Sequence, residues 1–183
     1  GIPIYVGAPY TLPMIENGAN RTLNYLWYYM GTYASVVLNW SEDDADGNGY
    51  SLRLENGGEG EAWGYSDCGK ISLAGTTNPV IYFSYKTDKA IASIYVIKPN
   101  GEEVLLKKLD NASENTMVKL DLNQFKNERY IRFRFYADLE GEGSFWFDDI
   151  NVLDFLDYNL VMSNVEVSNT VNMGATADVK LTV

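Results

Sequence analysis

The sequence predicts an all-β fold, built as an antiparallel sandwich, from two observations. From residue 50 onward, short runs of alternating apolar and polar residues are separated by turn residues. Helical spacing of apolar residues is scarce over the same stretch. The 183 residues suffice for one substantial core, and 14 Tyr and 4 Trp favour strands or a surface that contacts carbohydrate or protein.

The clearest strand pattern is the run YIRFRFYA. Ile131, Phe133 and Phe135 fall on one face of that strand, while Arg132 and Arg134 fall on the other. The segments KPNGEE and ENGGEGE supply turn residues between strands. The predicted strands are 50–56, 69–75, 79–88, 92–101, 102–110, 116–125, 129–138 and 143–152.

Two further segments are less regular. In ANRTLNYLWYYM, residues 19–30, Leu23, Leu26 and Met30 recur at helical spacing, but the Tyr and Trp content favours a strand, which we expect. Residues 156–183 hold two strand patterns, and two strands cannot bury their apolar faces alone. They either join the sandwich, pair with another chain by strand exchange or dimerisation, or begin a second domain.

Composition and charge exclude several classes of function. A net charge of −11 and a pI near 4.4 argue against nucleic-acid binding. The chain contains no histidine, which excludes a Ser/His/Asp or Cys/His catalytic site within it. Cys68 is the single cysteine, so we expect a small buried thiol. No apolar run has the length of a membrane span, so direct membrane insertion is not expected.

The segment DADGNGYSLRLE, residues 44–55, matches the ligand spacing of an EF-hand calcium loop. Its second half has the pattern of a strand, which would carry Glu55 roughly 20 Å beyond Gly49 at about 3.3 Å per residue. Glu55 therefore cannot return to the same ion. Two interpretations of the first half remain, an acidic turn and a helix-free calcium loop that uses Asp44 and Asp46.

The run FWFDDINV, residues 145–152, places two carboxylates side by side in an apolar strand. Successive strand residues point to opposite faces, so Asp148 and Asp149 cannot both face the same solvent. At least one of them faces protein, where an unpaired carboxylate is costly.

The order of these segments, from LPMIENG (12–18) to FWFDDINV, resembles the galactose-binding-like jelly rolls. Within that group it is similar to the cleaved-adhesin modules of gingipain-type surface proteases and to MAM domains, whose disulfide cysteines it lacks. IENG and FDDI match the recurring marks of these families. The resemblance implies a jelly roll over 12–155, with 1–11 as a linker or the end of an upstream module. The segment 156–183 looks like the first strands of a truncated Ig-like adhesion module.

The resemblance also implies a structural calcium ion. Carried over to this sequence, its ligands are Glu16, one of Asp148 and Asp149, and the 43–48 loop with Asp44 and Asp46. Calcium takes six to eight hard oxygen ligands, which this set could supply in part. The alternative is that the paired aspartates accept hydrogen bonds from loop amides or from arginine side chains.

Jelly rolls of this kind often bind glycans, and Trp63 and Tyr65 are the candidate ligand-binding residues. Trp63 stands in the Gly-rich, polar segment EGEAWGYSD, which suggests an aromatic side chain on a loop. Trp27, Trp40 and Trp146 are expected in the core. Carboxylate pairs are too frequent among 25 acidic residues to indicate a glycoside hydrolase, so we do not expect an enzyme.

The leading prediction is a non-catalytic extracellular binding or adhesion module from a multidomain bacterial surface protein, of which this chain is a piece. Its partner would be a glycan or a host or cell-surface protein, beside the neighbouring domains of the parent chain. The alternative is a structural spacer that binds nothing but calcium and positions a neighbouring domain.

Overall fold

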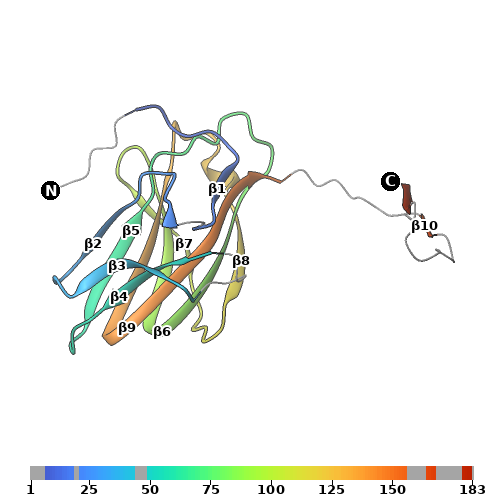
Figure 1. Ribbon diagram of the computed structural model, residues 1–183. Coiled ribbons are helices and arrows are strands. Elements are labelled where there is room, and N and C mark those ends of the chain that lie inside the picture. Colours follow the sequence, from blue (N-terminus) through green and yellow to red (C-terminus); the bar gives the residue numbers. More distant parts are fainter. Residues whose placement is uncertain (1–6, 19–20, 44–48, 156–163, 168–178, 183) are drawn as a thin grey trace.

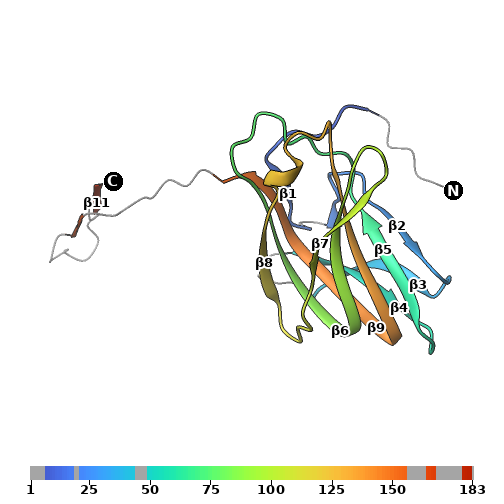
Figure 2. The same ribbon diagram turned by 180° about the vertical axis from the view of Figure 1, so that it is seen from behind.

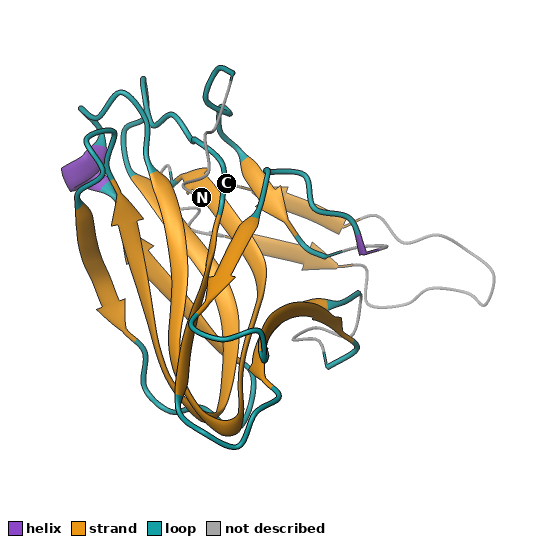
Figure 3. Ribbon diagram, turned by 90° about the vertical axis from the view of Figure 1, so that its left-hand side faces the viewer, coloured by secondary structure: helices purple, strands orange, loops and turns teal. Residues whose placement is uncertain are grey.

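The protein is an antiparallel β-sandwich, which confirms the predicted fold class (Figure 1). The computed structural model describes residues 7–18, 21–43 and 49–155, and the backbone of 164–167 and 179–182. The strands are β1 Met14–Glu16, β2 Tyr28–Gly31, β3 Val36–Ser41, β4 Ser51–Asn56, β5 Ala62–Asp67, β6 Pro79–Ile97, β7 Glu103–Lys108, β8 Thr116–Asp121, β9 Arg132–Asp154, β10 Asn164–Val167 and β11 Val179–Thr182. Figure 3 shows that strands dominate the fold.

Strands β6 and β9 each belong to both layers of the sandwich. Residues 90–97 of β6 and 132–139 of β9 pair with each other between β7 and β5, and β2 follows β5 at the edge. We call these five strands the β5 layer. Residues 79–88 and 144–154 of the same two strands pair again in the other layer. There they are flanked by β8 on one side, as Figure 2 shows, and by β4, β3 and β1 on the other. We call this the β4 layer.

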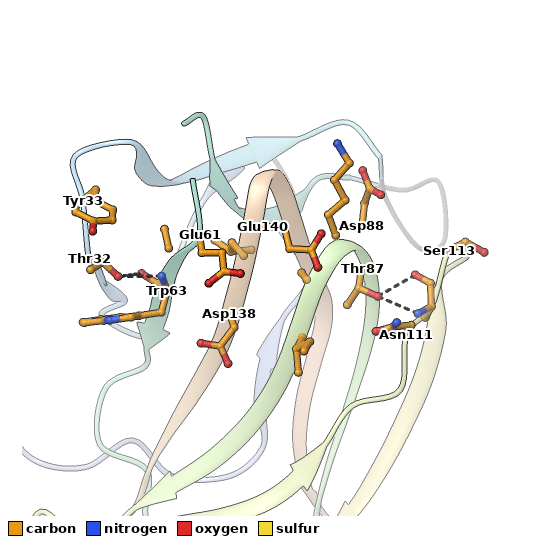
Figure 4. Close-up of a pocket in the computed structure, with 16 residues that line it drawn as sticks. Thr32, Tyr33, Glu61, Trp63, Thr87, Asp88, Asn111, Ser113, Asp138 and Glu140 are labelled. Carbon is orange, nitrogen blue, oxygen red and sulfur yellow. Dashed lines mark hydrogen bonds between the residues drawn. The ribbon is translucent and has the colours of Figure 1, made fainter. Parts of the chain in front are cut away.

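The change of layer takes place at one end of the sandwich, where both long strands turn back on themselves (Figure 4). Lys89 and Glu142 adopt positive φ angles of 47° and 60° there, and the ladder shifts register between Asp88 and Ala90. A Cβ on Gly141 would lie 2.3 Å from the carbonyl oxygen of Glu59. A glycine is therefore required where this turn crosses the neighbouring loop.

Phenylalanine side chains from both layers fill the core. Phe135 of the β5 layer stacks on Phe147 of the β4 layer, with ring centroids 4.6 Å apart and an interplanar angle of 9°. Phe83 meets Phe135 edge-on at 5.3 Å. Trp27 packs against both stacked rings at 5.9 and 6.1 Å, as predicted for a core tryptophan. Such aromatic pairs add to the burial of apolar surface that holds the layers together.

The strand predictions are partly correct. Residues 51–56, 103–108 and 116–121 form strands as expected, and Tyr28–Gly31 is a strand within the ambiguous 19–30 segment. Residues 79–88 and 92–97 of two predicted strands lie on the single strand β6, and residues 132–138 and 143–152 of two others lie on the single strand β9. The predicted residues 98–101 and 129–131 lie outside these strands.

Two strand assignments were wrong. Residues 69–75 were predicted to be a strand. The structure has only two isolated β-bridges there, from Ile71 to Tyr10 and from Ile71 to Ile131. The alternation in that segment reflects burial of Ile71 and Leu73 without a continuous ladder. Conversely, residues 62–67, expected to be a loop, form strand β5.

In the C-terminal part, β10 and β11 pair antiparallel with each other. This agrees with two strand patterns in 156–183, while their assignment to an Ig-like module stays a prediction. Among the residues that the structure describes, no helix has the length and apolar character needed to cross a membrane.

Candidate functional site

The outer face of the β5 layer carries a band of aromatic side chains. Along β5, Ala62, Gly64 and Ser66 are buried, whereas Trp63 and Tyr65 point to the opposite face. This alternation follows from the pleat of a strand. A Cβ on Gly64 would lie 2.6 Å from Cγ1 of Val36, so the glycine lets β5 pack closely on the core. The Gly-rich character of this segment therefore belongs to a strand, and the prediction that Trp63 lies on a loop was wrong.

Trp63 and Tyr65 form a parallel pair, with ring centroids 6.1 Å apart and an interplanar angle of 1°. The guanidinium carbon of Arg134 lies 3.7 Å from the centroid of the Tyr65 ring, and the Tyr65 hydroxyl contacts Sδ of Met30 at 3.4 Å. Trp63 remains 36% exposed. Trp63 is thus the more accessible ring, and Tyr65 is held by its neighbours.

A cleft of about 790 Å³ opens at the Trp63 end of this face (Figure 4). Trp63, Asp138 and Ile91 lie in one row across its floor, because Trp63 pairs with Asp138 and Asp138 pairs with Ile91 in the two ladders. The volume is within the range of ligand pockets in proteins. The residues that line it are Thr32, Tyr33, Glu61, Ala62, Trp63, Thr87, Asp88, Lys89, Ala90, Ile91, Asn111, Ala112, Ser113, Asp138, Leu139 and Glu140.

Hydrogen bonds fix both walls of the cleft to neighbouring strands. On one side, the Trp63 amide donates to the Thr32 hydroxyl at 2.9 Å and the Thr32 amide donates to the Trp63 carbonyl at 2.9 Å. On the other side, the Thr87 amide donates to the Ala112 carbonyl at 2.7 Å, and the Ala112 amide donates to the Thr87 hydroxyl at 2.9 Å. Both walls are therefore tied to strands, which suits a preformed site.

The charged groups of the cleft are mostly acidic. Its lining contains the carboxylates of Glu61, Asp88, Asp138 and Glu140, against the single ammonium of Lys89. Lys89 itself lies 4.0 Å from the carboxylate of Glu142. The cleft thus combines one accessible indole ring with several hydrogen-bond acceptors.

Asp138 is positioned by its neighbour on the same strand. The hydroxyl of Tyr136 donates a hydrogen bond of 2.6 Å to Oδ1 of Asp138. Burial raises the pKa of Tyr136, and the adjacent Asp138 carboxylate raises it further, so this hydroxyl stays protonated and donating at neutral pH. The remaining lone pairs of the Asp138 carboxylate can accept hydrogen bonds from a ligand.

An ion-pair network lies at the other end of the outer face of the β5 layer. Asp67 is 1% exposed and accepts bonds from Nε and Nη2 of Arg134 at 2.7 and 2.8 Å. Arg134 also reaches Glu103 on β7 at 2.5 Å, and Arg132 lies 3.5 Å from Asp67. This network links β5, β9 and β7, and it holds the guanidinium that covers Tyr65.

The carboxylates of Glu16 and Asp148 belong to a second candidate site, in the β4 layer. They are 2% and 5% exposed, and both line a cavity of about 10 Å³ with Gly18 and Tyr50. The pairing of Glu16 with Ile150 brings them together, because Ile150 lies two residues after Asp148. Glu16 accepts hydrogen bonds from the Asn24 amide at 2.8 Å, from its side chain at 3.1 Å and from Nε1 of Trp27 at 3.2 Å.

Asp149 lies outside that cavity. Its φ angle is 50°, at the register shift between Tyr82 and Ser84, and its amide donates to Oδ1 of Asp148 at 2.7 Å. Asp148 is thus the aspartate of the pair that faces protein. Asp44 and Asp46 lie outside the described residues. Within the described part of the chain, no group of three or more His, Cys, Asp or Glu side chains could hold a metal ion.

Glu55 and Trp146 lie on strands of the β4 layer. Glu55 is on β4 and contacts Arg53 at 3.0 Å, which agrees with the argument against an EF-hand. Trp146 is 9% exposed, and its ring is flanked by Lys86 and Arg53 at 4.5 and 5.0 Å. It is buried, but beneath two cationic side chains and outside the core cluster that contains its neighbours Phe145 and Phe147, so the expectation of a core position was only partly correct.

No protein-family model matches the sequence, and no curated protein matches it. Solved structures do share the fold. A family 11 carbohydrate-binding module of the cellulase Lic26A-Cel5E of Clostridium thermocellum is 11% identical, with a TM-score of 0.56 over 82% of this chain and 99% of that one. The chain thus shares the jelly-roll sandwich fold of this module.

Two further structures extend the comparison. TmCBM61, solved with β-1,4-galactotriose, is 10% identical with a TM-score of 0.53, over 70% of this chain and 88% of that one. A mutant of the family 29 carbohydrate-binding module CBM29-2, solved with mannohexaose, is 16% identical with a TM-score of 0.55, over 83% and 99% of the two chains. Identities this low establish the fold, and the gingipain-type, MAM-like and Ig-like assignments stay predictions.

A glycoside hydrolase domain also shares this fold in part. The Endo-D structure from Streptococcus pneumoniae is 15% identical with a TM-score of 0.59, over 85% of this chain and 26% of that one. The present chain thus spans about a quarter of that larger structure.

Sequence reasoning named Trp63 and Tyr65 as candidate ligand-binding residues, and that role stays a prediction. The structure places Trp63 in the lining of the cleft and Tyr65 outside it, and sequence reasoning did not name the other residues of the lining. Asp138 and Ile91 belong to the floor only because three strands, distant in sequence, pair in one register. The sequence does place Asp138 on a strand, yet it carries no signal for which strand lies beside it.

Proposed function

We propose that this chain is a non-catalytic carbohydrate-binding module whose ligand occupies the cleft at Trp63. The observation that carries the proposal is an accessible indole ring on the floor of a preformed cleft, next to hydrogen-bond acceptors on the adjacent strand. An aromatic ring can stack on the apolar face of a sugar, and carboxylates can accept hydrogen bonds from its hydroxyls. The shared fold with modules solved in complex with oligosaccharides supports the same proposal.

Affinity electrophoresis and calorimetry test this proposal. The panel comprises mixed-linked β-1,3-1,4-glucan, β-1,4-galactan and β-1,4-mannan, and we expect measurable binding to at least one of them. Trp63→Ala should abolish that binding. Phe155→Ala is the matched control, because Phe155 is 37% exposed and follows β9 in the β4 layer. Absence of binding to a broad glycan panel would favour the spacer alternative.

The non-catalytic part of the proposal has its own measurement. Prolonged incubation with the bound polysaccharide should release no reducing ends above a blank. Release that is lost in Asp138→Asn or Glu140→Gln would show instead that the cleft carboxylates act in hydrolysis.

We also propose that Glu16 and Asp148 hold a structural calcium ion. Two buried carboxylates line one cavity, and like charges so placed are costly unless a cation or a proton compensates them. Both residues offer the hard oxygen atoms that calcium prefers, and a carboxylate oxygen that accepts one hydrogen bond keeps a lone pair. When bound, the ion would neutralise charge and link β1 to β9.

Thermal unfolding in calcium and in a chelator tests this second proposal. The melting temperature should be higher in calcium, since a ligand that binds only the folded state stabilises it by mass action. Asp148→Asn should remove the difference, whereas Asp149→Asn should keep it. Equal melting temperatures of the unmodified protein in both buffers would refute the proposal.

A further inference from the structure

We propose, resting on the proposed glycan-binding function, that the Trp63 cleft selects uncharged glycan chains and rejects chains that carry carboxylate or sulfate groups. The first step is the position of Asp138. It pairs with Trp63 across the ladder, and neighbouring strands lie about 4.8 Å apart. A sugar ring stacked on Trp63 therefore has its edge beside the Asp138 carboxylate.

The second step is the charge around that sugar. Glu61 precedes β5 by one residue, and Glu140 follows Asp138 by two residues on β9. Both side chains are exposed and line the cleft around Trp63 and Asp138 (Figure 4). Asp88 adds a fourth carboxylate, while Lys89 supplies one positive charge that also lies 4.0 Å from Glu142. An anionic substituent on the ligand would thus meet several like charges at short range.

The third step weighs attraction against repulsion. Sugar hydroxyls donate to carboxylates, and hydrogen bonds to charged acceptors are stronger than those between neutral groups. A carboxylate on the sugar cannot donate when ionised, and it is repelled by the carboxylates of the cleft. At physiological ionic strength the screening length is about 8 Å, so groups within the cleft still interact. We expect the charged chain to bind at least about tenfold more weakly than the neutral chain.

Paired polysaccharides test the inference. The probes are whichever of the three neutral polysaccharides binds, and the same polysaccharide with its C6 hydroxyl groups oxidised to carboxylates. The readout is the ratio of the two Kd values for the full chain at 0.15 M and at 1 M salt. The ratio should be about ten or more at low salt, and it should fall at high salt because screening weakens repulsion.

Variants locate the source of the selectivity. The double variant Glu61→Gln and Glu140→Gln should bring the ratio towards one. Glu42→Gln is the control, since it removes one carboxylate from a side chain that follows β3 in the β4 layer and is 79% exposed. The ratio should stay unchanged in that control.

The outcomes separate the two proposals. If neither the neutral nor the oxidised chains bind, the carbohydrate-binding function itself fails. If both bind equally well, the function stands and the selectivity is refuted. A high ratio that the double variant leaves unchanged would also overturn the inference, because it would assign the discrimination to other groups.

Discussion

Phe135 and Phe147 stack face to face with ring centroids 4.6 Å apart, although both belong to the single strand β9. A continuous extended strand would separate them by ~40 Å, at about 3.3 Å per residue. The contact is possible only because β9 turns back between them. The stack therefore joins the two layers of the sandwich through one strand.

Removal of one ring from this stack should strongly destabilise the protein. Phe135→Ala leaves a cavity between the layers, and we expect a loss of about 3–5 kcal/mol in the free energy of unfolding. Urea unfolding followed by fluorescence gives this value. Met117→Ala, at a side chain that is 70% exposed, should change it by less than about 0.5 kcal/mol. Equal effects of the two substitutions would contradict the central place of the stack.

Gly141 should not tolerate a side chain, whereas Gly60 should. A Cβ at Gly141 would meet the carbonyl oxygen of Glu59 at 2.3 Å, while nothing lies within 4 Å of a Cβ at Gly60. We expect Gly141→Ala to cost about 1–3 kcal/mol, because backbone must shift at the turn of β9. Gly60→Ala should be close to neutral. The comparison of midpoints in one denaturant series decides between these expectations.

The buried Asp67 should make stability depend on pH. Burial raises the pKa of Asp67, although its hydrogen bond to Arg134 and the charges of Arg134 and Arg132 oppose the rise. The folded-state pKa therefore exceeds the unfolded value of about 3.9. Its contribution to stability is complete below that unfolded value and is lost as pH rises through the folded pKa.

Asp67→Asn isolates this effect. The free energy of unfolding, measured from pH 3 to 7, should decline with rising pH more steeply in the unmodified protein than in the variant over that window. The free energy of unfolding of the unmodified protein minus that of the variant should therefore fall with pH. If this difference grew with pH, Asp67 would instead have a lowered pKa, set by its arginine partners.

Cys68 should react with thiol reagents only after unfolding. Its side chain is fully buried, and burial raises the pKa of the thiol to about 12, although the Phe133 amide donates to Sγ at 3.1 Å. The thiolate is the reactive form, and in the folded state the thiol is neither accessible to the reagent nor ionised. Ellman's reagent at pH 8 should therefore report a slow reaction whose rate rises with urea. Immediate reaction of the native protein would show that this region opens readily.

The sequence predicted the inner face at the start of β9 correctly, because Phe133 and Phe135 of this strand, and Ile131 just before it, alternate with arginines and all three are buried. It also singled out Trp63, though on the wrong kind of element. Alternation is a local property that one strand reveals alone. The floor of the cleft depends on which strands lie side by side, and that pairing is set by long-range packing.

The calcium hypothesis also depends partly on a local sequence pattern and partly on long-range strand pairing. FDDI marked two adjacent carboxylates, but the residues alone did not decide which one faces protein. The register shift and the positive φ of Asp149 decide it, and such a bulge has no clear signature in the run FWFDDINV. The contact of Glu16 with the same cavity required the pairing of β1 with β9.

The two shared strands also bear on how the molecule opens. Ile91 and Asp138 lie on β6 and β9, which run through both layers, so neither layer can detach as a separate cooperative unit. Amide hydrogens at these positions should exchange with solvent deuterons only through global unfolding, while those of the edge strand β2 should exchange by local fraying. The part of the cleft floor that these two strands form should therefore exchange more slowly than the edge strand beside it.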